Sequence, residues 1–261
     1  MADQHPLVLA WAQSWASDPT LLAACYTENA TLELPGMVAA HFVGRDQIAD
    51  HAARLAFAVP DRHVDLVRLV HAGRTLVAEW VFTGRNVEDL VTMAAPGLTW
   101  WDLDDNGRIA NELRVVQWST RRIADAASHP HLKAGTGPTR SSIWYREFAD
   151  RLLDVVSPYP DLALSSLYRH GASRHAVIPA PSAPPDTHTD THTHTHTHTE
   201  SGAGLAARRP SLVAVVGQGS VMAVRFDPSG TGHAAVIVEL DDSDRIVDER
   251  SYHGSWWPSP I

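Results

Sequence analysis

The stretch LDDNGRIANELR, residues 103–114, is the strongest indication of the fold, because a similar stretch occurs later in the chain. The sequence LDDSDRIVDERS, residues 240–251, matches it without a gap, with the same Leu-Asp-Asp start, the same Arg-Ile pair and a Glu three residues later. In the first copy the Asn-Gly pair favours the positive φ of a tight turn between antiparallel strands. The stretch therefore predicts a β-hairpin, and its recurrence predicts a second one.

Two further blocks recur upstream of these hairpins, in the same order. Residues 66–84 align with residues 212–230 without a gap, and residues 22–35 align more weakly with residues 164–177. A single match could arise by chance, whereas three collinear matches indicate an internal duplication. The second copy is shorter between its two hairpin blocks and has a Pro/His/Thr-rich tract where the first copy has a helical pattern, so we expect it to be the degenerate one.

The composition bounds the class of protein. The chain has 261 residues, which is long for one domain and ample for two of about 120 residues each. Its formal net charge of −9 argues against a nucleic-acid-binding surface, since such surfaces concentrate Lys and Arg. The single cysteine, Cys25, excludes an internal disulfide. No apolar run approaches the roughly 18 residues of a membrane span, so we expect a cytoplasmic protein that binds neither nucleic acid nor membrane.

The order of local patterns predicts two domains of the α+β class. Helical patterns at residues 6–16, 19–28 and 44–60 surround a strand pattern at residues 30–35, and antiparallel hairpins follow. Helices gathered first and hairpins afterwards argue against a parallel sheet. We expect a first domain over residues 1–123, a polar linker over 124–140 and a second domain over 141–255, with a disordered Pro/His/Thr-rich insertion over 179–204.

Four segments of the first copy resemble the nuclear transport factor 2-like superfamily, and within it the SnoaL-like polyketide cyclases and ketosteroid isomerases. They are YTENATLELPG at 26–36, GRDQIADH at 44–51, VPDRHVDLVRLVHAGRTLVAEWVFTG at 59–84 and WWDLDDNGRIANELRV at 100–115. The resemblance implies a cone-shaped, curved antiparallel sheet with helices that close a pocket, present here in tandem with a degenerate second copy. The superfamily includes isomerases, cyclases, dehydratases, epoxide hydrolases and non-catalytic members, so the resemblance alone does not select a reaction.

The positions that carry catalysis in the superfamily hold other residues in this sequence. The general base of ketosteroid isomerases corresponds to Leu34, and their two oxyanion-hole residues correspond to Ala10 and Thr99. The catalytic Asp of polyketide cyclases corresponds to Arg114, which cannot act as a base because a guanidinium does not lose its proton in proteins. The Arg-x-Asp pair of the epoxide hydrolases has no counterpart in LTWWDL, residues 98–103. No catalytic set of the superfamily is therefore complete.

The same resemblance indicates which side chains face the interior of the first cone. Glu112 and Arg114 lie two residues apart on the last strand, hence on one face, and are the candidate catalytic pair. One hypothesis makes Glu112 a general acid or base, and the other makes the two residues a structural ion pair. The residues expected to bind a substrate are Trp11, Trp80, Thr99, Trp101 and Trp118.

Two classes of function stay open. The first is an enzyme that isomerises, cyclises or hydrolyses an apolar, ring-containing metabolite by acid–base chemistry. The second is a non-catalytic ligand-binding or scaffold protein whose two cones form an internal pseudo-dimer. We expect a small-molecule ligand, no cofactor, no metal site, and either a monomer with this pseudo-dimer or a homodimer. The alternating histidines within residues 179–204 could bind a metal, but we favour an inert repeat because no fixed surroundings are evident.

Overall fold

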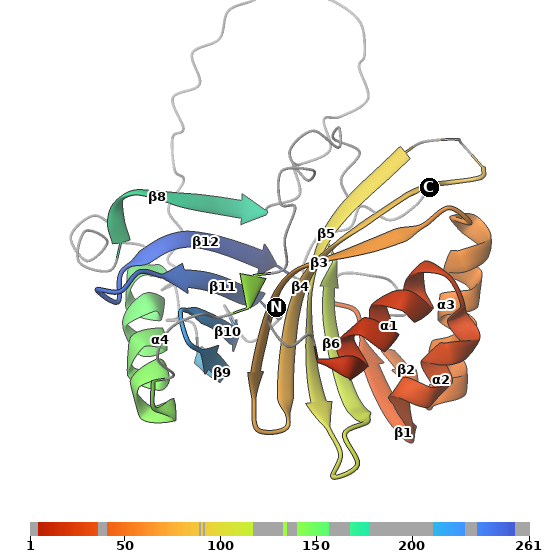
Figure 1. Ribbon diagram of the computed structural model, residues 1–261, viewed down its shortest axis with the longest axis horizontal. Helices are drawn as coiled ribbons and strands as arrows, with labels where there is room; N and C mark the ends of the chain where they lie inside the picture. The colour runs from red at the N-terminus through yellow and green to blue at the C-terminus, as the bar shows by residue number, and fades with distance from the viewer. Residues whose placement is uncertain are drawn as a thin grey trace, which may run out of the picture.

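Two β-sheets lie face to face at the centre of the molecule, and helices cover the outer side of each sheet (Figure 1). None of the helices in the part of the chain described below is long and apolar enough to cross a membrane. The computed structural model describes residues 5–35, 41–88, 90, 92–116, 133–134, 140–156, 168–177, 211–227 and 234–253.

The first sheet has seven strands in the order β2-β1-β6-β5-β4-β3-β7. Neighbouring strands pair antiparallel, except that β1 joins β6 and β7 joins β3 in parallel. The helices α1 and α3 contact β3 and β1, so they cover the same sheet. The elements are α1 (Pro6–Ala16), η1 (Pro19–Leu21), α2 (Leu22–Cys25), β1 (Tyr26–Glu33), β2 (His41–Val43), α3 (Arg45–Ala58), β3 (His63–Ala72), β4 (Thr75–Arg85), β5 (Thr92–Leu103), β6 (Ile109–Val116) and β7 (Lys133–Ala134).

The second sheet has five strands in the order β8-β12-β11-β10-β9, which repeats the order β1-β6-β5-β4-β3 of the first. The sense of pairing repeats as well, because β8 joins β12 in parallel and the other neighbours are antiparallel. Even the register matches, since Tyr26 pairs with Ile109 and Tyr168 pairs with Ile246. The elements are α4 (Ser142–Val156), β8 (Tyr168–Val177), β9 (Ser211–Gln218), β10 (Val221–Asp227), β11 (Ala234–Leu240) and β12 (Ile246–His253).

The two repeated stretches form hairpin turns of the same design, as their sequence predicted. In the first, the Asp104 backbone N–H donates to the Arg108 carbonyl at 2.8 Å, and in the second the Asp241 N–H donates to the Arg245 carbonyl at 2.9 Å. The positive φ that each turn requires falls on Gly107, at 75°, and on Asp244, at 60°. Turn chemistry is therefore common to both halves of the chain.

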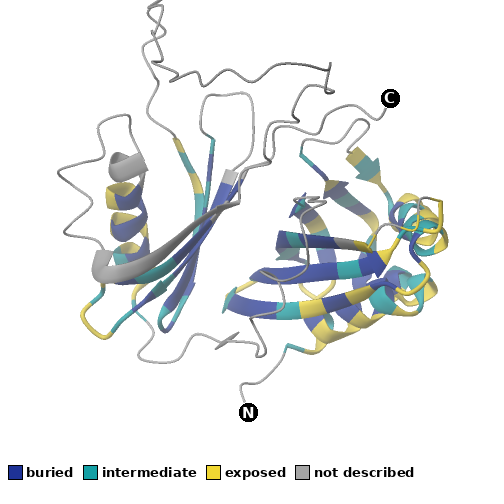
Figure 2. Ribbon diagram, turned by 90° about the horizontal axis from the view of Figure 1, so that it is seen from above, coloured by how far each residue is buried: buried dark blue, intermediate teal, exposed yellow. Residues whose placement is uncertain are grey.

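The two sheets bury a shared apolar core where they face each other (Figure 2). The largest member of this core is Trp100 on β5, which is 4% exposed. Separate cores lie between each sheet and its own helices. The shared core consists of Val70, Val77, Leu98, Trp100, Leu113 and Val115 from the first sheet and Val216, Val221, Ala223, Ala235, Ile237 and Tyr252 from the second.

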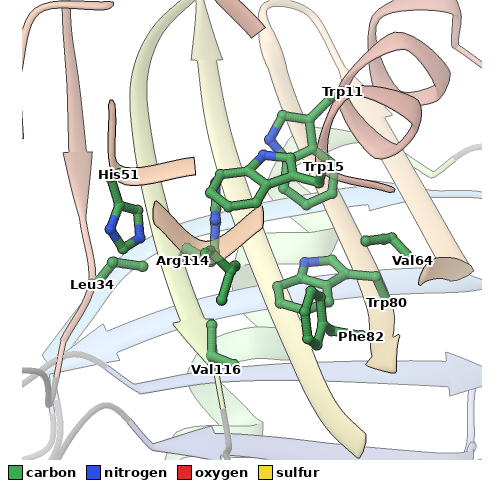
Figure 3. A pocket seen from close by; sticks show the side chains of 10 residues that line it. Trp11, Trp15, Leu34, His51, Val64, Trp80, Phe82, Arg114 and Val116 are labelled. Carbon is green, nitrogen blue, oxygen red and sulfur yellow. The ribbon is translucent and has the colours of Figure 1, made fainter. Parts of the chain in front are cut away.

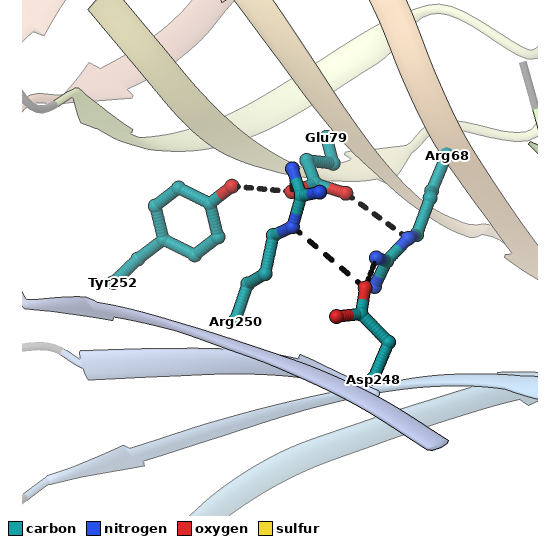
Figure 4. A network of polar contacts seen from close by, with 5 residues as sticks. All are labelled: Arg68, Glu79, Asp248, Arg250 and Tyr252. Carbon is teal, nitrogen blue, oxygen red and sulfur yellow. Dashed lines mark hydrogen bonds and ion pairs between the residues drawn. The ribbon is translucent and has the colours of Figure 1, made fainter. Parts of the chain in front are cut away.

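Charged side chains cross the same interface as a buried network (Figure 4). Glu79 on β4 accepts hydrogen bonds from Tyr252 Oη at 2.6 Å and from Arg250 NH1 at 3.0 Å. Arg68 on β3 places its Nε 3.3 Å from the other oxygen of Glu79 and donates to Asp248. Because Glu79 is 1% exposed, its buried negative charge is stabilised in part by Tyr252 and Arg250 from the second half.

The structure departs from the sequence-based expectations in two respects. The helix expected at residues 19–28 is one short turn that ends at Cys25, because β1 begins at Tyr26 and buries Tyr26, Ala30 and Leu32. The sheets are mixed, since β1 and β8 enter in parallel. A second sheet with a covering helix supports the tandem arrangement in part, whereas the insertion at residues 179–204 lies outside the described residues.

Candidate functional site

A small cavity lies between α1, α3 and the face of the first sheet that these helices cover (Figure 3). Its volume is about 70 Å³. Apart from His51 and Arg114, the side chains around it are apolar or aromatic. The described residues that line it are Trp11, Trp15, Leu34, His51, Leu55, Val64, Trp80, Phe82, Arg114 and Val116.

Trp80 forms one wall of the cavity because its partner on the next strand is a glycine. Gly97 pairs with Trp80 across β4 and β5, and a Cβ at Gly97 would lie 2.3 Å from the indole ring. The Trp80 Nε1 donates a hydrogen bond of 2.8 Å to Thr99 Oγ1. The absence of a side chain at Gly97 and the bond to Thr99 together fix the position of this ring.

The opposite wall comes from α1, where helical spacing places Trp11 and Trp15 on one face. Trp11 packs edge-to-face against Trp101, with 5.0 Å between ring centroids, and its Nε1 donates to Tyr26 Oη at 3.3 Å. The carbonyl oxygen of Trp15 accepts a hydrogen bond of 2.5 Å from Arg62 Nε, which satisfies one of the free carbonyls at the end of the helix. The Trp11 indole is therefore held from outside the cavity, and Arg62 anchors the end of the helix that carries Trp15.

A buried ion pair lies directly behind the lining. Arg114 places its guanidinium 4.0 Å from the centre of the Trp15 ring and lines the cavity. Glu112 Oε1 accepts from Arg114 Nε at 2.6 Å and lies 2.5 Å from Arg114 NH2, while Glu112 Oε2 accepts from the Tyr26 hydroxyl. Glu112 is 2% exposed, so both oxygens of its carboxylate are engaged inside the protein.

The protonation of the groups around this pair follows from burial. Burial raises the pKa of Tyr26 well above its ordinary value, and the nearby charge of Glu112 raises it further, so the phenol stays protonated and donates. Burial lowers the pKa of His51 from 6.5 to about 4, with further contributions from the positive charges of Arg114 and Arg54. His51, which stacks on Phe42 at 4.5 Å, is therefore neutral at physiological pH.

Three of the residues predicted from the sequence line the cavity: Trp11, Trp80 and Arg114. Trp118 lies outside the described residues. His51 also lines the cavity, and its place on the inner face of α3 follows from the same helical spacing as that of the buried Ile48 and Ala52. Three of the predicted residues thus lie around one cavity.

The other predicted residues lie behind the lining. Glu112 is bonded to the lining arginine, Thr99 accepts a hydrogen bond from a lining tryptophan, and Trp101 packs against another. Sequence reasoning missed Tyr26, which donates to Glu112 from the start of β1. The signal that could have found it was its recurrence as Tyr168 in the repeat, at the point where a parallel strand begins.

In the second half, side chains of α4 pack against its own sheet. Tyr145, Phe148 and Leu152 of α4 pack into the core beneath β10 and β11. Tyr145 lies over Gly217, where a Cβ would be 2.2 Å from its ring. Among the residues that the structure describes, no group of three or more His, Cys, Asp or Glu side chains is placed to hold a metal ion.

The geometry defines an α+β domain with a small aromatic cavity, and the comparison with protein families agrees with it. Residues 8–112 match the SnoaL-like domain family. This part of the chain therefore holds a SnoaL-like domain, built here from a mostly antiparallel sheet and few helices. No curated protein matches the chain.

Several solved structures are similar to part of the chain. A protein from Catenulispora acidiphila with a ketosteroid isomerase-like fold, crystallised with trimethylamine, is 22% identical over 42% of this chain and 83% of its own, with a TM-score of 0.38. TsrD from Streptomyces laurentii is 20% identical over 42% of this chain and 84% of its own, with a TM-score of 0.37. IdmH from Streptomyces antibioticus, assigned as a polyketide cyclase, is 18% identical over 42% and 88%, with a TM-score of 0.38.

Proposed function

We propose that the SnoaL-like domain binds a compact, largely apolar molecule in its cavity and releases it unchanged. The observation that carries this proposal is the engagement of Glu112, whose two carboxylate oxygens accept from Arg114 and Tyr26 behind the lining. A general base must reach the proton that it removes. Glu112 is not among the residues that line the cavity, so its geometry fits a structural ion pair better than a catalyst.

The titratable groups that do line the cavity are poorly suited to acid–base catalysis. Arg114 keeps its proton under all physiological conditions. His51 has a pKa of about 4, and a catalytic base works best when its pKa lies near the working pH. Among the described residues, the lining therefore offers recognition and little proton transfer.

The size of the cavity limits the ligand. Its volume of about 70 Å³ is well below the roughly 150 Å³ of an apolar cavity that holds benzene. A ring-containing metabolite, the ligand class expected from the sequence, would require the surrounding side chains to move apart. A molecule of a few heavy atoms enters the space as it stands.

The second half has the role of a partner domain in this proposal. Its sheet repeats the strand order of the first, and its Tyr252, Asp248 and Arg250 contact charged groups that the first sheet buries. These contacts support an internal pseudo-dimer, with proposed domain boundaries at residues 1–123 and 141–255. In this view the second copy has kept its surface for pairing and has lost its pocket.

An acid–base enzyme is the second candidate, favoured by one observation. The imidazole of His51 lines the cavity and is unprotonated at physiological pH, so it is able to accept a proton from a bound molecule. Such an enzyme would isomerise, cyclise or hydrolyse its ligand and would lose this activity on His51→Phe.

A binding and turnover experiment separates the two candidates. A mixture of small metabolites is incubated with the wild type and with Val116→Phe, a variant that fills the cavity, and the bound and free fractions are analysed by mass spectrometry. We expect a compound that only the wild type retains, with the free fraction unchanged in composition. A compound that the wild type consumes and the variant does not would establish the enzyme instead.

A further inference from the structure

The polar groups that face the cavity are almost all hydrogen-bond donors. The indole N–H groups of Trp11 and Trp80 already donate to Tyr26 and Thr99. The Nε1 of Trp15 is buried and has no hydrogen-bond partner among the described residues. A ligand that satisfies this lining must therefore supply an acceptor.

Arg114 adds the strongest donors, because only one edge of its guanidinium is used. A guanidinium carries five N–H groups arranged as two forks, one formed by Nε with one terminal nitrogen and the other by the two terminal nitrogens. Nε and NH2 of Arg114 both lie against a single oxygen of Glu112, at 2.6 Å and 2.5 Å. On the other fork, NH2 is buried and contacts only Glu112 among the described residues, and NH1 has no hydrogen-bond acceptor among them, although the side chain is only 5% exposed.

The free fork matches one chemical group better than others. Two parallel N–H bonds to the two oxygens of a carboxylate are the geometry that arginine favours. A cationic ligand would meet the positive charge of Arg114 with no free carboxylate in the lining to compensate it. The apolar walls formed by Leu34, Phe82 and Val116 would enclose a short hydrocarbon tail.

We infer that the free fork of Arg114 binds the carboxylate of a compact aliphatic acid in the aromatic cavity of the first domain. This inference rests on the proposed binding function and specifies the ligand class. The Glu112 carboxylate holds the guanidinium from behind, Trp15 stacks on its face, and the acid completes its hydrogen bonds from the cavity side.

Three probes of equal shape and different charge test the inference on the unmodified protein. Propionate, propionamide and propionamidine share one carbon skeleton and carry a negative, a zero and a positive charge. Binding is followed by the indole N–H signals of an ¹⁵N-labelled sample, in which the Trp15 signal reports directly on the cavity. We expect propionate to bind about ten-fold more tightly than propionamide, because hydrogen bonds between ionised groups are roughly twice as strong as neutral ones, and propionamidine not to bind.

A pair of arginine variants locates the effect. Arg114→Lys keeps the positive charge opposite Glu112 but removes the fork, so we expect propionate to bind about ten-fold more weakly while propionamide changes little. Arg74→Lys, at an exposed arginine on the β3–β4 turn, is the matched control and should leave both affinities unchanged. Equal binding of the acid and the amide, or propionate binding that survives Arg114→Lys, would overturn the inference.

The same experiments distinguish a failure of the proposed binding function from a failure of the carboxylate assignment. If Val116→Phe abolishes the retention of some metabolite but none of the three probes binds, the cavity binds ligands and the carboxylate assignment is wrong. If neither the metabolite mixture nor the probes bind to the wild type, both the function and the ligand class are wrong.

Discussion

Replacing Glu112 by Gln removes one charge from the buried pair and leaves its shape almost unchanged. In the wild type Arg114 and Tyr26 both donate to the carboxylate, which provides only acceptors. The amide has one acceptor oxygen, so it can serve only one of the two donors. If its oxygen turns to Arg114, its NH2 group faces the Tyr26 hydroxyl, which already accepts from Trp11 and would lose its own acceptor.

The magnitude follows from the burial of these groups. Arg114 is 4% exposed, and leaving one member of a buried ion pair without its partner costs about 3–5 kcal/mol. The free energy of unfolding of a natural domain is roughly 5–15 kcal/mol, so Glu112→Gln should remove a large part of it. For a chain of this size the melting temperature should fall by on the order of 10 °C.

Equilibrium unfolding in urea, followed by tryptophan fluorescence, measures this loss. Glu28→Gln, which removes the charge of an exposed carboxylate on β1, is the control and should shift the midpoint little. In the triple variant Glu112→Leu, Arg114→Met and Tyr26→Phe both charges and the Tyr26 hydroxyl are removed, and of their partners only the indole N–H of Trp11 loses its acceptor, so we expect the variant to regain most of the stability. A loss below about 1 kcal/mol for Glu112→Gln would refute the structural role of the pair.

Three further predictions concern the cavity and the interface. Gly97→Ala places a Cβ 2.3 Å from the Trp80 ring and should lower the free energy of unfolding by about 1–3 kcal/mol and weaken ligand binding, measured by urea titration and by the probes above. The depressed pKa of His51 makes the folded state bind a proton less readily than the unfolded state does. The contribution of neutral His51 to stability is therefore fully present above pH 6.5 and is lost as the pH falls toward about 4. Across this range the melting temperature should fall less steeply for His51→Gln than for the wild type. Tyr252→Phe removes the 2.6 Å hydrogen bond to Glu79 and should cost about 1–3 kcal/mol, with an unchanged affinity for ligands.

The hairpins and the order of elements could be predicted because local chemistry specifies them. The Asp-Asp-x-x-Arg-Ile pattern forms the same turn in both halves, and Asp104 and Asp241 accept equivalent backbone hydrogen bonds. The helices α1 and α3 followed from apolar spacing and end within two residues of their predicted limits. The recurrence in sequence also anticipated the matching strand order of the two sheets.

The parts that could not be predicted depend on contacts between distant segments. The parallel entry of β1 beside β6 joins residues at least 80 positions apart, and no local pattern reports such a pairing. For the same reason the donation from Tyr26 to Glu112 was missed. Glu79 and Arg68 are single charges within apolar stretches of the sequence, and only the packing of the second sheet explains their burial.

The number of ligand molecules bound per chain tests whether the cavity of the first domain is the binding site. The proposed binding site is the aromatic cavity around Arg114 in the first domain, and Tyr145 and Phe148 pack in the core of the second half. Native mass spectrometry of the full chain with propionate should show one bound molecule per chain, and none in Val116→Phe. Two bound molecules per chain, or one molecule that persists in Val116→Phe, would contradict a single binding site in this cavity.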